Sequence, residues 1–289
     1  MSSCCIGLCV KDSENGLVQV LNNVDKIRDL FLEIKVIIAY DESSDASMQI
    51  LADYSIKHDD TIIINAGNKK TYRNSNEKHV DRSERIANAR NIILDYIYKF
   101  FSSWEYFVMM DTNYYSCVTP IDTEVLSRVI KSSEWDGLSF NRDPYYDIWA
   151  LSIPPLVLSC WHIYKCDKAL ALYEKYIKDK LAKLGPDEFL PVMSAFCGFA
   201  IYRTDKFKGC RYSGKFDINM FSEQSVRKNA EILDSKLFIR VNDCEHRNFH
   251  VNAIKKNSAR IMVSPLHLFP KASNVLPDTA PKKMSVKFN

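Results

Sequence analysis

The chain has 289 residues with 39 basic and 36 acidic side chains, a formal net charge of +3, and 46% hydrophobic residues. This charge balance gives no electrostatic reason to expect nucleic acid as a partner, and no apolar stretch reaches the ~20 residues that a membrane-spanning helix needs. The N-terminus lacks the basic flank and apolar core of a signal peptide, so the nine cysteines are expected to be reduced. We therefore expect a cytoplasmic globular protein with one large core or two small ones.

Strands and helices alternate in the first half of the chain. Short apolar runs predict strands, and apolar residues at helical spacing predict the helices between them. The predicted strands are 4–10, 32–40, 61–65 and 105–110, and the predicted helices are 17–31, 46–54, 82–101 and 121–132. Residues 67–80 are polar, basic and without periodicity, which predicts a loop. This alternation of strands and helices indicates an α/β fold with a mostly parallel central sheet flanked by helices.

The second half is less regular. Its predicted strands are 135–141, 196–202, 237–241 and 260–263, and its predicted helices are 167–184, 224–233 and 249–255. After residue 265 the chain is rich in Pro, Lys and Ser, which predicts a surface strap or a frayed tail. Because no repeat or linker is apparent, we predict one domain over residues 1–265 and a tail over 266–289.

Several nucleotide-binding and catalytic motifs are absent from the sequence. No Gly-x-Gly-x-x-Gly follows the first strand, and no Gly-x-x-x-x-Gly-Lys-Ser/Thr loop occurs. The Gly-x-Ser-x-Gly turn of α/β-hydrolases is also missing. With only eight glycines in the chain, a ligand is expected to be held by side chains and a metal rather than by glycine-rich backbone.

An acidic residue ends the most apolar predicted strand. The run from Tyr106 to Met110 leads directly into Asp111, and Asn113 follows two positions later. Ligands bind at the carboxyl ends of strands in open α/β sheets, and a carboxylate with a second oxygen ligand can hold a divalent cation and thus a diphosphate. The alternative is an ordinary Asp that begins a turn after a core strand.

Two further polar clusters follow the same pattern. Asp41, at the end of the second predicted strand, could accept hydrogen bonds from a base or a ribose hydroxyl, whereas Asp45 is a plausible helix N-cap. A capping turn is therefore the alternative for this cluster. On the third predicted helix, Arg85 could pair with phosphate, and a solvated helix face is the alternative.

A last cluster lies late in the chain. Glu245, His246 and His250 offer a general base and possible metal ligands within a few residues. Together with Cys244 they could also suggest a zinc site, but no Cys-x-x-Cys pair exists in the chain. Helix capping is the stronger alternative.

The order of these motifs resembles the nucleotide-sugar-dependent glycosyltransferases of the GT-A fold, a Rossmann-like single domain. The matching segments, from about residue 6 to residue 265, are Asp-Glu-Ser-Ser-Asp at 41–45, Arg-Ile-Ala-Asn-Ala-Arg-Asn at 85–91 and Met-Asp-Thr-Asn at 110–113. Segments 145–151, 197–202 and 243–250 resemble a subgroup that includes fungal capsule-type mannosyltransferases and giant-virus glycosyltransferases. The Asn-, Lys- and Ile-rich composition would suit an AT-rich genome, including a viral one, and then a location in the host cytoplasm.

The resemblance implies a hexosyltransferase that moves a sugar from a nucleotide-diphosphate sugar to a hydroxyl of a glycan or protein. It implies Mn²⁺ or Mg²⁺ on the donor diphosphate, with Asp111, Asn113 and His250 as ligands. Many relatives carry a second Asp where Asn113 stands, so this metal site has one negative charge fewer.

The resemblance also implies roles for other residues. The implied donor-binding residues are Asp41, Asp45, Arg85, Arg90, Asp111 and Gly198. The implied catalytic base is Glu245, with Asp147 as the second choice. The acceptor or the transferred sugar is expected against Tyr146, Trp149 and His246.

Two other interpretations stay open. A non-catalytic nucleotide-sugar or glycan-binding module of the same fold is favoured by the neutral Asn113. A nucleotidyltransferase would also use strand-end carboxylates and a metal, but residues 11–16 make a poor phosphate-binding loop.

Overall fold

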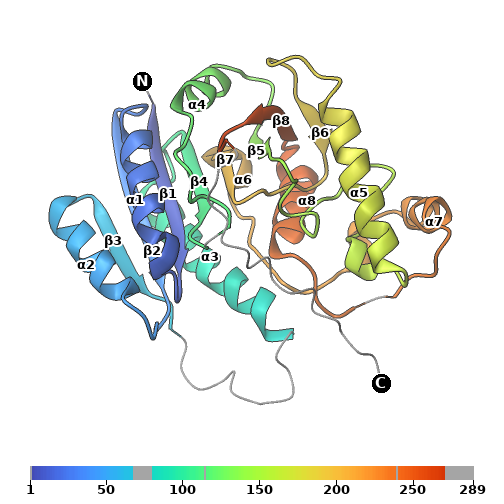
Figure 1. Ribbon diagram of the computed structural model, residues 1–289, viewed down its shortest axis with the longest axis horizontal. Coiled ribbons are helices and arrows are strands. Elements are labelled where there is room, and N and C mark those ends of the chain that lie inside the picture. Colours follow the sequence, from blue (N-terminus) through green and yellow to red (C-terminus); the bar gives the residue numbers. More distant parts are fainter. Residues whose placement is uncertain (1, 68–79, 114, 239, 271–289) are drawn as a thin grey trace.

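The computed structural model describes residues 2–67, 80–113, 115–238 and 240–270 (Figure 1). In these residues eight strands form one sheet. In their order across the sheet the strands are β3 (Thr61–Asn65), β2 (Glu33–Tyr40), β1 (Ser3–Val10), β4 (Tyr106–Asp111), β7 (Phe199–Arg203), β5 (Gly137–Asn141), β8 (Ile261–His267) and β6 (Leu190–Val192). The pairings β1–β2, β2–β3, β1–β4 and β5–β8 are parallel, and the other three are antiparallel.

Helices flank this sheet on both faces, which confirms the predicted α/β class. The helices are α1 (Glu14–Arg28), α2 (Ser47–Lys57), α3 (Val80–Phe100), α4 (Thr123–Ile130), α5 (Cys166–Leu181), α6 (Thr204–Phe207), α7 (Glu223–Ile232) and α8 (Glu245–Asn257), with 3₁₀ turns η1 (Cys160–His162) and η2 (Ile218–Met220). Figure 1 shows α5 and α7 at the opposite end of the molecule from α1 and α2. None of the described helices is long and apolar enough to cross a membrane.

The alternation of side chains along the strands determines which face each residue occupies. In β4, Tyr106, Val108 and Met110 belong to the apolar cluster beneath α1 and α4. Phe107 and Met109 belong to the cluster beneath α3, α5 and α8. Asp111 continues the second series, so its side chain lies on the face that α3 and α8 cover.

The chain reverses its winding direction between β1 and β4. From β1 it moves outward through β2 to β3, and it then returns to place β4 on the other side of β1. The ends of the two strands are joined by the Thr112 hydroxyl, which donates to the Cys9 carbonyl at 2.7 Å. Ligands bind at such a switch point in open α/β sheets, and Asp111 stands there.

The elements of the first half agree with the prediction to within a few residues at each end. In the second half the prediction of a strand over 237–241 is wrong, because the described residues of this segment form only an isolated bridge, between Leu237 and Ile163. β6 was not predicted, since it is a three-residue strand that contains Pro191. The predicted loop 67–80 lies mostly outside the described residues, as does the tail from residue 271.

Two boundaries also differ from the prediction. α8 begins at Glu245 rather than near Phe249, because its first turn buries Glu245, His246 and Arg247, and buried polar residues carry no hydrophobic signal. β8 runs to His267, so the predicted domain end at residue 265 falls inside a strand.

Candidate active site

A buried arginine links two carboxylates from distant parts of the chain. Arg90 on α3 donates from Nη2 to Asp111 Oδ1 at 3.0 Å, and its Nε lies 3.1 Å from Glu245 Oε1 at the start of α8. The Nε–H has no well-aligned acceptor among the described residues, so the second contact is an ion pair only. The guanidinium lies 4.8 Å from the ring centre of Phe196 and 5.7 Å from that of Tyr212. Arg90 is therefore rigidly held between both carboxylates.

A third carboxylate, Asp147, completes the cluster. Burial raises the pKa of Asp147 to about 7, although its hydrogen bond from the Ala150 N–H opposes the shift, and the charges of Glu245 and Asp111 raise it further. Burial likewise raises the pKa values of Glu245 and Asp111, and Arg90 partly offsets both shifts. Perturbed carboxylates that gather at a strand end are typical of catalytic sites.

The side chain of Asn113 does not fit the role of metal ligand that was predicted for it. Its Oδ1 accepts hydrogen bonds from the backbone N–H groups of Tyr115 and Ser116, both at 2.9 Å. Because backbone N–H groups can only donate, they determine the orientation of the amide. The Nδ2 group therefore faces Asp111 Oδ2 at 3.2 Å and the Tyr146 hydroxyl at 2.9 Å. Asn113 shapes the turn after β4 and supports Asp111 as a donor.

The two histidines of α8 are buried in positions that do not fit the metal-binding and acceptor-binding roles predicted for them. His250 is fully buried, and its ring nitrogens lie 3.0 Å from the hydroxyls of Ser194 and Tyr202, so the core occupies both positions that could bind a metal. His246 is 1% exposed and stacks on Phe196 with ring centres 3.8 Å apart, so it cannot contact an acceptor directly. Burial holds the pKa of His246 well below its usual value. Both residues are part of the support beneath Glu245.

The residues predicted for the nucleoside come from two parts of the fold, the segment after β2 and α3. Asp41 follows β2 and pairs with Lys11 at 2.6 Å. Asp45 accepts hydrogen bonds from the backbone N–H groups of Glu14 and Ser47, both at 3.0 Å, so both of its oxygens serve the turn before α2. The N-cap of α2 is Ala46, and the prediction of Asp45 as the N-cap is wrong. Arg85 is exposed on α3.

Two other features complete the surroundings of the carboxylates. Tyr146 is 38% exposed and reaches Asn113 through its hydroxyl. Arg82, which carried no predicted role, lies close enough for its charge to lower the pKa values of Asp111 and Glu245. The only feature of the sequence that could have indicated a role for Arg82 in this site is its position on the same helix as Arg90.

Gly198 holds the backbone of Asp111 in place. Its carbonyl, just before β7, accepts from the Asp111 N–H at 2.7 Å. Its φ of +84° lies in the left-handed region, and an added Cβ would collide with Cβ of Ser116. Glycine is thus required here by backbone conformation and by space.

We expect Gly198→Ala to destabilise the protein by roughly 2–5 kcal/mol, the sum of positive-φ strain and overpacking. Urea unfolding followed by circular dichroism measures this loss. Gly209→Ala is the matched control, because Gly209 has a φ of +75° but open space around its Cβ position; it should lose only about 1–2 kcal/mol. Equal losses in both variants would contradict the role of the Ser116 contact.

A preformed metal site is not present among the described residues, since no three His, Cys, Asp or Glu side chains there are placed to share an ion. Asp111, with 19% of its side chain exposed, receives one bond on each oxygen from the described residues, from Arg90 and from Asn113, which leaves one lone pair on each oxygen for a ligand. Mg²⁺ is commonly held by one or two carboxylates together with substrate phosphates and waters. The residues therefore fit a cation that arrives with a diphosphate ligand, with Asp111 as the protein ligand.

Neither a protein-family model nor a curated protein matches the chain. Among solved structures, it is similar to S. aureus TarS 1–349 in complex with UDP-GlcNAc, with 15% identity, a TM-score of 0.45, and coverage of 93% of this chain and 57% of that chain. It is also similar to the mannosyltransferase PcManGT from Pyrobaculum calidifontis in complex with GDP-Man and Mn²⁺, with 10% identity, a TM-score of 0.39, and coverage of 93% and 58%.

A third similar structure is glucosyl-3-phosphoglycerate synthase from Mycobacterium tuberculosis in complex with Mn²⁺, UDP and phosphoglyceric acid. The identity is 9% and the TM-score 0.37, over 71% of this chain and 57% of that one. The chain thus spans less than three fifths of the length of each of these three chains, from 57% to 58%.

Proposed function

We propose that this protein is a glycosyltransferase that moves a hexose from a nucleotide-diphosphate sugar to a hydroxyl acceptor. The observation that carries the proposal is the convergence of Asp111, Glu245 and Asp147 around the buried Arg90 at the switch point of the sheet. The motif order that resembles GT-A glycosyltransferases, including the fungal capsule-type and giant-virus subgroup, supports the same function.

The donor is proposed to lie across the ends of β1, β2 and β4. Asp41 and Arg85 bind the nucleoside end, and Arg90 holds the Asp111 carboxylate beneath the diphosphate. Asp111 would ligate Mn²⁺ or Mg²⁺, which when bound supplies positive charge next to the leaving diphosphate. Because Arg90 is buried against two aromatic rings, Asp111 is positioned before the donor arrives, and little reorganisation is needed.

The acceptor hydroxyl must lose its proton as its oxygen attacks the anomeric carbon. Glu245 is the proposed base, since burial raises its pKa towards the range in which a carboxylate accepts a proton effectively. Asp147 lies close enough to take this role instead, and its pKa of about 7 also suits it. Tyr146 and Trp149 flank Asp147 in the chain and are proposed to contact the sugars.

A non-catalytic binding module is the second candidate, because the Asn113 oxygen is engaged by backbone N–H groups and cannot strengthen metal binding. The two candidates differ in donor hydrolysis. We expect the full chain with Mn²⁺ to release UDP or GDP slowly from UDP-glucose, UDP-GlcNAc or GDP-mannose, measured by nucleotide detection. CMP-linked sugars lack the diphosphate and serve as the negative control. Binding in a thermal-shift assay without any release would favour the module.

A further inference from the structure

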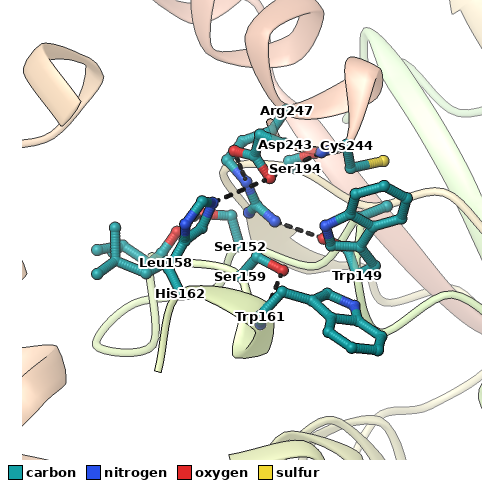
Figure 2. A network of polar contacts seen from close by, with 12 residues as sticks. Trp149, Ser152, Leu158, Ser159, Trp161, His162, Ser194, Asp243, Cys244 and Arg247 are labelled. Carbon is teal, nitrogen blue, oxygen red and sulfur yellow. Dashed lines mark hydrogen bonds and ion pairs between the residues drawn. The ribbon is translucent and has the colours of Figure 1, made fainter. Parts of the chain in front are cut away.

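Three large aromatic side chains gather around an arginine beside η1, and two of them are exposed. Trp161 is 42% and Phe238 51% exposed, and the Arg240 guanidinium lies 5.6 Å and 5.5 Å from their ring centres. The Trp149 ring lies 6.4 Å from that of Trp161 at a steep angle, and Figure 2 shows the two indoles side by side. We call Trp149, Trp161, Phe238 and Arg240 the aromatic platform. Exposed aromatic side chains that gather in one place are typical of a binding surface.

A buried ion pair holds the loop that carries Trp149, one residue of the aromatic platform. Arg247 on α8 is fully buried and donates from Nε to Asp243 Oδ2 at 2.8 Å. Its Nη groups donate to the carbonyls of Leu151 at 2.9 Å and Trp149 at 2.5 Å. Figure 2 shows this guanidinium between Asp243 and the Trp149 carbonyl. The loop that carries Trp149 is thus held by a fixed charge.

His162 lies between this aspartate and the other residues of the aromatic platform. The His162 Nδ1 accepts from the Arg240 N–H at 3.2 Å, so its Nε2 carries the proton and lies 3.7 Å from Asp243 Oδ1. The His162 carbonyl accepts from the Phe238 N–H at 2.8 Å, and Arg240 Nε donates to the Trp161 carbonyl at 3.0 Å. His162 thus ties Phe238 and Arg240 to its own segment, while its Nε2 faces Asp243 without a hydrogen bond among the described residues.

Burying this ion pair carries a desolvation cost that the pair's own attraction seldom exceeds. The hydrogen bonds of Arg247 orient the loop that carries Trp149, and those of His162 and the Trp161 carbonyl orient Phe238 and Arg240. Such support is expected for a preorganised binding site. The platform also adjoins the proposed catalytic groups in the chain, since Asp147 stands two residues before Trp149 and Glu245 two residues after Asp243.

We propose that the aromatic platform is an acceptor subsite for a second sugar ring, so that the acceptor is an oligosaccharide rather than a protein hydroxyl or a monosaccharide. This inference rests on the proposed function. The C–H face of a pyranose stacks on an aromatic ring, and the Arg240 N–H groups can donate to its hydroxyls. A sugar, unlike a purely apolar ligand, offers hydroxyl groups to the guanidinium that lies against Trp161 and Phe238.

The test compares acceptor length in wild type and Trp161→Ala, using the full chain and the donor found by hydrolysis. The acceptors are matched mono-, di- and tetrasaccharides on an array, together with serine-containing peptides. We expect wild type to modify at least one oligosaccharide about tenfold more efficiently than its monosaccharide, which corresponds to ~1.4 kcal/mol. Trp161→Ala should lose this preference through a higher KM, and Trp161→Phe should keep most of it.

Donor hydrolysis without acceptor should be the same in all variants, which separates this inference from the proposed function. If wild type releases no nucleotide, the proposed function itself fails. Phe100→Ala is the matched control, because Phe100 is 53% exposed at the far end of α3 from the carboxylates. Phe238→Ala gives a second variant should Trp161→Ala not fold. Equal length preference in wild type and both platform variants, a preference for peptides, or hydrolysis without transfer to any saccharide would overturn the inference.

Discussion

Asp111→Ala is expected to lower sugar transfer by about a thousandfold, the scale seen when one group that stabilises developing charge is removed. Asp111 is the carboxylate that faces the donor diphosphate in the proposed site, and its backbone is held by Gly198. The fold should survive, because Arg90 keeps its ion pair with Glu245. Nucleotide release measured over a Mn²⁺ titration gives the loss, and circular dichroism monitors the fold.

Asp95→Ala is the matched control for this variant. Asp95 also lies in an ion pair, with Arg211, but its side chain is 56% exposed on the outer part of α3. Surface ion pairs contribute little to stability, so this variant should keep full activity. Full activity in Asp111→Ala would show that the cation and diphosphate are bound elsewhere.

Glu245→Gln is expected to lower kcat by roughly a hundredfold to ten-thousandfold, the range for loss of a general base. The amide keeps the shape of the side chain and still offers an oxygen to Arg90, so donor binding should change little. Single-turnover rates and the nucleotide Kd separate the two effects. A parallel loss of nucleotide affinity would mean that Glu245 positions Arg90 instead of accepting the proton.

Asp147→Asn provides the comparison that assigns the base. The Asn oxygen can still accept from the Ala150 N–H, so the loop should keep its shape. A base with a pKa of about 7 is ionised only above that pH, and kcat would then rise as the pH increases through 7. If Asp147→Asn removes such a rise and causes the larger loss, the base is Asp147 and not Glu245.

The proposed metal site illustrates how a motif can be present without its expected geometry. Asp111 and Asn113 have the spacing of a two-ligand motif, yet the Asn113 oxygen accepts from two backbone N–H groups of the following turn. A turn of this kind needs an oxygen at that position, and an amide supplies it without adding charge. The cation is therefore expected to depend more on the donor phosphates than a site with two carboxylates would.

Local patterns in the sequence determined the α/β class and the strand that delivers Asp111. Continuous apolar residues in β1, β2 and β4 predict buried parallel strands, because both of their faces are covered by helices. These features depend only on neighbours in the chain, so one sequence was sufficient to predict them.

Contacts between distant segments were decided only by the tertiary structure. The pairing of Arg90 with Glu245, the burial of His250 against Ser194 and Tyr202, and the placement of Trp161 beside Trp149 each join residues that are far apart in sequence. The first turn of α8 buries charged and polar groups that pair with other elements, and a hydrophobic pattern cannot reveal such pairing. Periodicity reports which face of an element is apolar, whereas the partner of a buried charge depends on how the whole chain packs.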